Sequence, residues 1–164
     1  MVGEINMEKN ELVIHKMAEI FVETMQQMAF IDIAPVEKKF SFSQEALAVK
    51  LEVLMPYTGD LIVVFDKDLA KEFASNVFGE AQINLINEPL ADATSEFMNV
   101  IIGKIFAVFA PDMLFELGLP KSISAVFDSS PYVVQSYVSP EGKNMAFYFR
   151  SDRLLAAFEH EKKK

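Results

Sequence analysis

The feature of this sequence that most constrains the fold is a long, mostly apolar segment that runs from Asn87 to Pro111. Asn87 is a residue type that caps helix N-termini, Pro89 fits a first helical turn, and Pro111 ends a helix. The segment therefore predicts a single long helix. Because an apolar helix of this length must bury one whole side, the remaining elements are expected to pack around it.

The two sides of this predicted helix differ in character. At about 100° per residue, one side gathers the apolar residues that are expected to face the core: Leu90, Phe97, Ile101, Ile105 and Val108. The opposite side gathers four residues within about 40° of a common line, which we call the polar stripe: Asp92, Glu96, Asn99 and Gly103. Within the stripe, Glu96 and Asn99 stand one helical turn apart on the same face.

The polar stripe has two interpretations. It can be the solvent-facing side of an amphipathic helix, or a carboxylate and a carboxamide that together bind a cation and orient a small polar molecule. The stripe is narrow, and Val100, Ile102 and Phe106 flank it, whereas a solvated side would carry several Lys or Glu residues. Polar groups surrounded by apolar residues are typical of protein-docking surfaces, which counts against the first interpretation but leaves both open.

The remaining segments predict an α+β fold. Apolar residues at helical spacing predict helices at 10–28, 69–78 and 153–160, the second of them capped by Asp66-Lys67-Asp68 and ended by Gly79. Alternating or continuous apolar residues predict strands near 40–42, 46–55, 61–65, 122–127, 133–138 and 145–150, and residues 30–36 are expected to form a turn or short strand. Residues 112–119 are expected to be irregular or helical. The strand at 61–65 is apolar on both faces, which predicts a central position in the sheet.

The expected architecture follows from the order of these elements, which is roughly αβββααβββ. Hairpins dominate and repeated βαβ units are absent, so we expect helices packed on a largely antiparallel sheet. The chain is interpreted as a single domain over residues 1–164, with 1–9 and 161–164 expected to be flexible. Unpaired late strands would present exposed backbone at a sheet edge.

Composition excludes several classes of site. The net charge of −9 argues against nucleic-acid binding, because phosphates require clustered Lys and Arg. The absence of Cys and the presence of only two His exclude a zinc site of the common kinds. The sequence has no Gly-rich phosphate loop and no His-supported nucleophile. Short apolar runs and an acidic N-terminal segment predict no membrane insertion and no signal peptide, and the absence of Cys fits the expected cytoplasmic location.

The residues of the stripe carry a resemblance to a known family. Glu96-Phe97-Met98-Asn99 followed by Val100-Ile101-Ile102-Gly103-Lys104 resembles the Glu-x-x-Asn-x-x-x-Gly helix of the CheC/CheX/FliY phosphatases of bacterial chemotaxis. Asp92 stands where that pattern has Asp or Ser. Upstream, residues 58–65 and the helix through Val77-Phe78-Gly79 resemble the strand–helix unit of CheX. The single copy of the motif resembles CheX more than CheC, which usually carries two.

The resemblance implies a function: a phosphatase for a phospho-aspartyl CheY-like response regulator. It implies that Asn99 orients the attacking water, that Glu96 pairs with a lysine of the partner, and that Asp92 supports them. It also implies contacts to the partner from Gly103, Ser95 and Met98. Ser95 and Met98 stand where CheX-like helices often have glycine, so larger side chains are expected beside the docking face, and Pro120 lies closer to Asn99 than the motif proline.

The implied phosphatase needs no cofactor of its own, because Mg²⁺ is expected on the partner receiver domain. The resemblance also implies a homodimer, which we expect to be joined at sheet edges. The alternative function is a non-catalytic CheX-like module that binds a receiver domain or a flagellar switch component.

Overall fold

The computed structural model describes residues 2–55, 57–79, 88–150 and 153, without the side chains of residues 2–13 and 88–91. Along the chain, the described elements are α1 (Val2–Ala29), β1 (Ala34–Val36), β2 (Leu47–Met55), β3 (Gly59–Phe65), α2 (Lys67–Phe78), α4 (Glu88–Phe109), β4 (Glu116–Leu117), β5 (Lys121–Ile123), β6 (Val133–Val138) and β7 (Asn144–Arg150). This order confirms the predicted α+β class and the position of the long helix.

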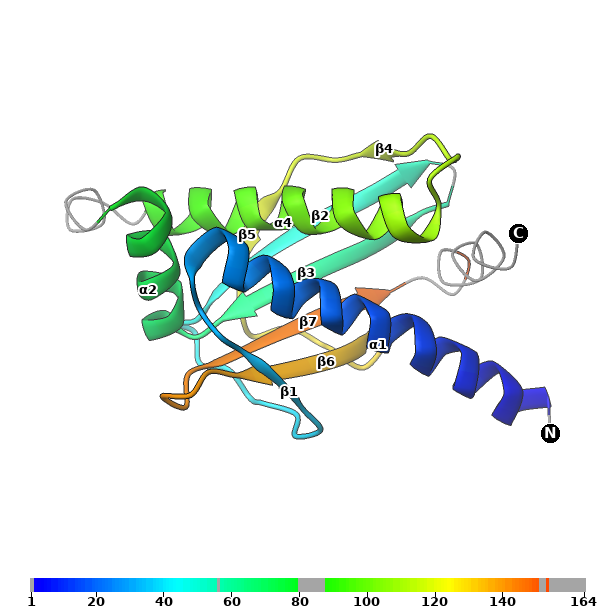
Figure 1. The fold of residues 1–164 in the computed structure, drawn as a ribbon, viewed down its shortest axis with the longest axis horizontal. Coiled ribbons are helices and arrows are strands. Elements are labelled where there is room, and N and C mark those ends of the chain that lie inside the picture. Colours follow the sequence, from blue (N-terminus) through cyan, green and yellow to red (C-terminus); the bar gives the residue numbers. More distant parts are fainter. Residues whose placement is uncertain (1, 56, 80–87, 151–152, 154–164) are drawn as a thin grey trace.

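The strands described form one antiparallel sheet in the order β1-β6-β7-β3-β2-β4, with β5 also paired to β2 (Figure 1). The central position predicted for the strand at 61–65 is confirmed, because β3 pairs with β2 on one side and with β7 on the other. β7 is paired with β6 and β3, whereas β6 is paired with β7 along its length and with β1 only over 136–138. The outer strands are β1 at one side and the short β4 and β5 at the other.

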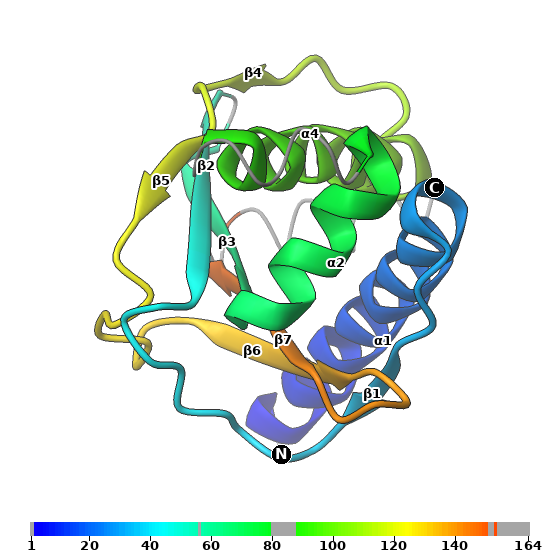
Figure 2. The same ribbon diagram turned by 90° about the vertical axis from the view of Figure 1, so that its left-hand side faces the viewer.

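The three described helices cover one face of the sheet (Figure 2). Here α1, α2 and α4 enclose the main core with inward-facing residues of the strands, among them Leu51, Val63 and Phe147. The opposite face carries a smaller cluster of mainly small residues, with Ala48, Ala125 and Ala146 buried beneath partly buried aromatics. The core is therefore strongly one-sided, and α4 lies in the layer that carries most of it.

Several predicted boundaries are wrong. The first helix, predicted to begin at residue 10, begins at Val2. Residues 40–42 form no strand, and instead Phe42 packs against the second face of the sheet. The segment 112–119 contains the short strand β4, and the strand predicted at 122–127 ends at Ile123. The helix predicted at 153–160 and the tail at 161–164 lie outside the described residues, Arg153 excepted.

Among the described residues, no helix is both long enough and apolar enough to cross a membrane.

Candidate functional site

The helix that carries the polar stripe is anchored by its apolar side. Phe97, Ile101 and Ile105 are fully buried, as predicted. Val108 is 46% exposed, which corrects its assignment to the core: the helical wheel gives the direction of a side chain but not the extent of the layer that covers it. The side chain of Leu90 and the predicted cap Asn87 lie outside the described residues.

Phe97 is the residue that fixes α4 in the core. Its ring packs against three other aromatic rings, with centroid distances of 5.7 Å to Phe21 of α1, 5.7 Å to Phe65 of β3 and 5.3 Å to Phe73 of α2. One side chain therefore contacts both neighbouring helices and the central strand. Because Phe97 directly follows Glu96 in the chain, the backbone that carries Glu96 and Asn99 is held by the aromatic packing of the main core.

The four residues of the polar stripe are all exposed, on the side of α4 that faces away from the sheet. Within the part of the chain that the structure describes, the side chains of Glu96 and Asn99 form no hydrogen bond or ion pair. A carboxylate and a carboxamide are thus presented to solvent about one helical turn apart on a rigid element. Both groups are available to bind an external polar molecule.

The flanks of the stripe differ from the prediction. Met98 is fully buried and belongs to the main core, so its side chain is not part of the exposed surface beside the stripe. Ile102 is also buried, whereas Ser95 and Val100 are half-buried at the two borders of the stripe. Phe106 is half-buried and stacks on Phe115, with 3.7 Å between ring centroids. The stripe is therefore bordered by few exposed large apolar residues of α4 itself.

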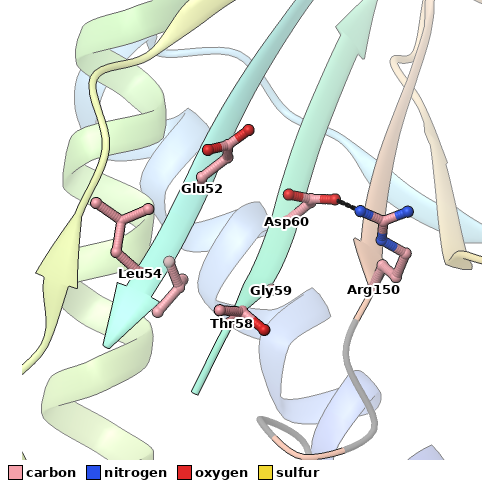
Figure 3. Close-up of a pocket in the computed structure, with 7 residues that line it drawn as sticks. Glu52, Leu54, Thr58, Gly59, Asp60 and Arg150 are labelled. Carbon is pink, nitrogen blue, oxygen red and sulfur yellow. Dashed lines mark hydrogen bonds and ion pairs between the residues drawn. The ribbon is translucent and has the colours of Figure 1, made fainter. Parts of the chain in front are cut away.

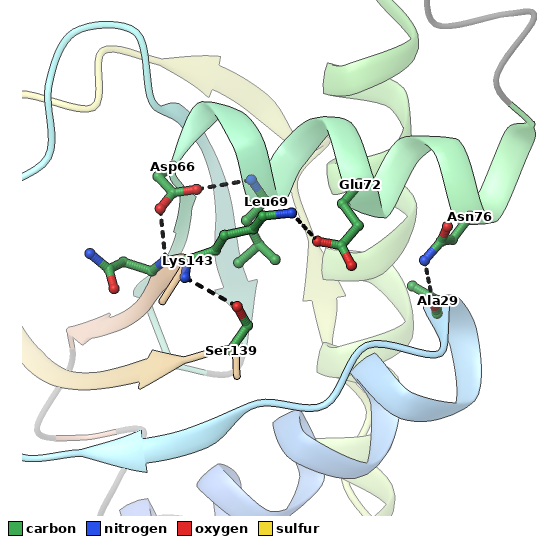
Figure 4. Close-up of polar contacts among 8 residues, drawn as sticks. Ala29, Asp66, Leu69, Glu72, Asn76, Ser139 and Lys143 are labelled. Atoms are coloured by element: carbon green, nitrogen blue, oxygen red, sulfur yellow. Dashed lines mark hydrogen bonds and ion pairs between the residues drawn. The ribbon is translucent and has the colours of Figure 1, made fainter. Parts of the chain in front are cut away.

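On one side the stripe borders the end of α1. Lys104 Nζ donates a hydrogen bond of 2.8 Å to Gln27 Oε1, and Gln27 Nε2 in turn donates one of 3.0 Å to Glu23. At the same end of α1, Asn76 of α2 donates a hydrogen bond of 2.7 Å to the carbonyl of Ala29 (Figure 4). The last turn of α1 is thus joined to both other helices, next to Gly103 of the stripe.

A pocket of about 220 Å³ lies at the end of the β2–β3 hairpin, lined by residues that include Glu52, Thr58, Asp60 and Arg150 (Figure 3). Asp60 is only 5% exposed, and its carboxylate pairs with Arg150 and accepts a hydrogen bond of 3.4 Å from the Tyr132 hydroxyl. Burial and the Asp60 charge raise the pKa of Tyr132. Asp60 is thus paired with Arg150 and hydrogen-bonded to Tyr132, so we interpret this cluster as a structural ion pair.

No local sequence pattern indicates this cluster, because the partners of Asp60 lie 72 and 90 residues further along the chain, at Tyr132 and Arg150. Among the described residues, no group of three or more His, Cys, Asp or Glu side chains is placed to hold a metal ion. Of the site residues predicted from the sequence, the structure places four on one exposed side of α4, namely Asp92, Glu96, Asn99 and Gly103. Met98 lies in the core.

Comparison with known proteins bears on this geometry. The sequence matches the family model described as chemotaxis phosphatase CheX over residues 49–130, which are 82 of the 164 residues and include the whole stripe. Direct comparison with curated proteins gives no match.

Solved structures share the fold at low sequence identity. A chemotaxis protein CheX from Vibrio vulnificus is 18% identical with a TM-score of 0.67, and the match covers 84% of this chain and 95% of that one. The CheX of a CheX–CheY–BeF₃–Mg²⁺ complex from Borrelia burgdorferi is 17% identical, with a TM-score of 0.62 and coverage of 84% and 97%. Thermotoga maritima FliY is 17% identical, with a TM-score of 0.61 and coverage of 95% and 96%.

The family model spans the strand–helix unit and the stripe-bearing helix, and the structures reproduce the arrangement of helices on one face of an antiparallel sheet. The chain therefore belongs to the CheX family of chemotaxis phosphatases.

Proposed function

We propose that this protein dephosphorylates a phospho-aspartyl CheY-like response regulator, with Asn99 and Glu96 as the residues that act on the partner. The observation that carries the proposal is the pair itself: two exposed, unpaired polar side chains one turn apart on α4, whose backbone is held by the aromatic packing of Phe97. Membership of the CheX family and the CheY in the complex of the Borrelia protein support the choice of partner.

In the proposed reaction, a water molecule attacks the phosphorus atom in line with the bond to the aspartyl oxygen. That bond breaks, and inorganic phosphate and the free aspartate carboxylate of the partner are released. Asn99 contributes position, because its amide can donate a hydrogen bond to the water oxygen and accept one from a water proton. Holding the nucleophile in line supplies much of the acceleration in phosphoryl transfer.

Glu96 acts on the partner and not on the water. An ionised carboxylate accepts hydrogen bonds only, and it would bind a lysine ammonium at the active site of the receiver domain. This ion pair fixes the register in which the receiver docks, so that Asn99 reaches the phosphoryl group. Asp92, one turn before Glu96, adds negative charge on the same side of the helix. The Mg²⁺ that neutralises the phosphoryl oxygens would belong to the receiver, so the stripe needs only to supply position and charge.

The test uses a panel of CheY-like receiver domains phosphorylated with a small-molecule phosphodonor, and it measures phosphate release with and without this protein. Wild-type protein should accelerate release from at least one receiver. Asn99→Ala should abolish the acceleration while it leaves binding to the beryllofluoride-loaded receiver within about threefold. The matched control is Gln44→Ala, which removes an exposed carboxamide from the segment that precedes β2 and should change nothing.

The alternative function, a non-catalytic module that binds a receiver domain or a flagellar switch component, gives a different result. In that case the receiver binds, but phosphate release is as slow with wild-type protein as without it. Glu96→Lys then separates the two roles further, because it should weaken binding under either function and lower the rate only under the proposed one.

A further inference from the structure

Phe30 combines two features that each oppose stability. It directly follows α1 in a left-handed backbone conformation, with φ of 56°, and its N–H donates a hydrogen bond of 3.0 Å to the carbonyl of Gln26. This is the position after a helix where glycine is strongly preferred, because a Cβ is crowded in that conformation. Its side chain is also 76% exposed, so the ring makes little contact with the rest of the protein.

Neither feature is explained by the fold. A glycine at this position would relieve the backbone and remove an exposed aromatic ring, while the hydrogen bond that closes the helix uses only backbone atoms. The neighbouring residue Ile31 is buried and already supplies the apolar contact that commonly accompanies such a helix end. A strained residue that its surroundings do not require is an indication of function.

The position of Phe30 relative to the stripe indicates which function. Gln27, three residues earlier, is hydrogen-bonded to Lys104 of α4, the residue that follows Gly103 of the stripe. Ala29, immediately before Phe30, is held by Asn76 of α2. The end of α1 is therefore fixed by two neighbouring helices and adjoins the flank of the stripe that carries Lys104, so Phe30 follows a rigid support.

Gly103, which precedes Lys104 in α4, is likewise a residue type that the fold does not favour at its position. It lies within α4, it is exposed, and a Cβ built on it would meet no atom within 4 Å. Alanine would fit there and would favour the helix. Position 30 therefore holds phenylalanine although glycine would suit the backbone better, and position 103 holds glycine although alanine would suit the helix better. A partner that packs closely over Gly103 and also takes up the exposed ring at the end of α1 accounts for both residues.

We propose that Phe30 is an aromatic anchor that inserts into an apolar depression on the receiver domain when that domain docks on the polar stripe. The proposal rests on the proposed function and specifies the second part of its docking surface. A protein partner is favoured over an anionic lipid surface, because Asp92 and Glu96 lie on the adjacent helix and the chain carries a net charge of −9. Buried aromatic residues are among the commonest hot spots of protein interfaces.

The experiment compares Phe30→Gly, Phe30→Tyr and a matched control, Val126→Ala, which shortens an exposed apolar side chain that precedes β6. Phe30→Gly should raise the Tm by about 2–4 °C, because the left-handed conformation is no longer strained. It should also weaken binding to the beryllofluoride-loaded receiver about ten- to hundredfold. Phosphate release should show a raised KM with an unchanged kcat, because docking is impaired and the stripe is intact. Phe30→Tyr should retain binding.

The outcomes separate this inference from the proposed function. If wild-type protein accelerates phosphate release and Phe30→Gly has the same KM, the anchor is overturned and the catalytic proposal stands. If Phe30→Gly instead converts a dimer into a monomer without changing the KM, the ring belongs to a contact between copies of this chain, and the inference is equally overturned. If wild-type protein binds a receiver without accelerating release, the catalytic proposal fails, and binding of the Phe30→Gly variant still decides the anchor.

Discussion

Asp66 and Asn144 are joined by a reciprocal pair of hydrogen bonds. The backbone N–H of Asp66 donates to the carbonyl of Asn144 at 3.0 Å, and the backbone N–H of Asn144 donates to Asp66 Oδ2 at 2.7 Å. The other carboxylate oxygen of Asp66 accepts a hydrogen bond of 2.9 Å from the N–H of Leu69 and caps α2 (Figure 4). One side chain thus starts a helix and fixes the beginning of β7.

Replacing Asp66 with alanine should therefore destabilise the protein by about 2–3 kcal/mol, more than the loss of a helix cap alone. The variant loses the bond to Leu69 and leaves the N–H of Asn144 without its acceptor. Urea unfolding followed by circular dichroism measures the change. Asp68→Ala is the matched control, because Asp68 is exposed in the first turn of the same helix and should cost less than about 1 kcal/mol. Equal losses for the two variants would contradict the dual role.

Asp66 also illustrates which parts of the fold can be predicted from the sequence. The cap at Asp66 and the end of α2 at Gly79 follow from local rules, and both are confirmed. The bond to Asn144 joins residues 78 positions apart, so no local pattern contains it. The strand predicted at 40–42 fails for a related reason: alternation at Phe40 and Phe42 describes two aromatic rings that pack, but strand formation also requires a neighbouring strand with free backbone groups.

For the candidate site, too, local patterns predict one part and tertiary packing decides the rest. Periodicity placed the residues of the stripe on one exposed side of α4, which the structure bears out. Met98 was assigned to a docking face by its position in a motif, whereas its burial depends on how α4 leans against its neighbours. Phe30 carried no sequence signal, because its left-handed conformation is known only once the end of α1 is located.

Met98→Leu tests the position of Met98 directly. The substitution conserves volume in a fully buried site, so the free energy of unfolding should change by less than about 1.5 kcal/mol. Because the side chain does not reach the surface, receiver binding and phosphate release should remain as in wild type. The measurement is the same phosphate-release assay. A change in KM without a change in stability would place Met98 at the interface after all.

Tyr137→Phe should stabilise the protein. The Tyr137 ring lies in the main core and stacks on Phe21, but its hydroxyl is buried and has no hydrogen-bond partner among the described residues. Removing this oxygen should raise the free energy of unfolding by about 1 kcal/mol. Tyr132→Phe is the contrasting control, because it removes a hydroxyl that donates to Asp60 and should be destabilising or neutral. Destabilisation by Tyr137→Phe would show that the hydroxyl is satisfied.

The same residue makes stability sensitive to alkaline pH. Burial raises the pKa of Tyr137 above the ordinary tyrosine value of about 10. Above that pH the unfolded chain loses the hydroxyl proton while the folded chain retains it. The free energy of unfolding is therefore independent of this group below about pH 10 and falls as the pH rises above it. Lys143 acts in the same direction, because its hydrogen bond to Glu72 at 2.5 Å raises its pKa.

Urea unfolding at pH 9, 10 and 11 measures this dependence. Wild-type stability should fall over the range, and the fall should be smaller in Tyr137→Phe by up to about 1.4 kcal/mol per pH unit above pH 10, the value for one titrating group. Identical slopes for the two proteins would mean that Tyr137 titrates in the folded state as it does in the unfolded chain.

Gly103→Ala should raise the stability of the protein and weaken its binding to the partner. Alanine replaces a glycine in the interior of α4, where a Cβ meets no atom within 4 Å, so the free energy of unfolding should rise by about 0.5–1 kcal/mol. In the free protein nothing opposes the added methyl group. If a receiver packs closely over this point of the stripe, the methyl group must displace part of the partner, and the KM for the phospho-receiver should rise several-fold while the protein becomes more stable.

Gly79→Ala is the informative comparison, because Gly79 has a φ of 92° and alanine there should lower stability without affecting the KM. A Gly103→Ala protein that is more stable and equally active would show that the partner keeps clear of Gly103. It would also confine the docking surface to the part of α4 that carries Asp92, Glu96 and Asn99.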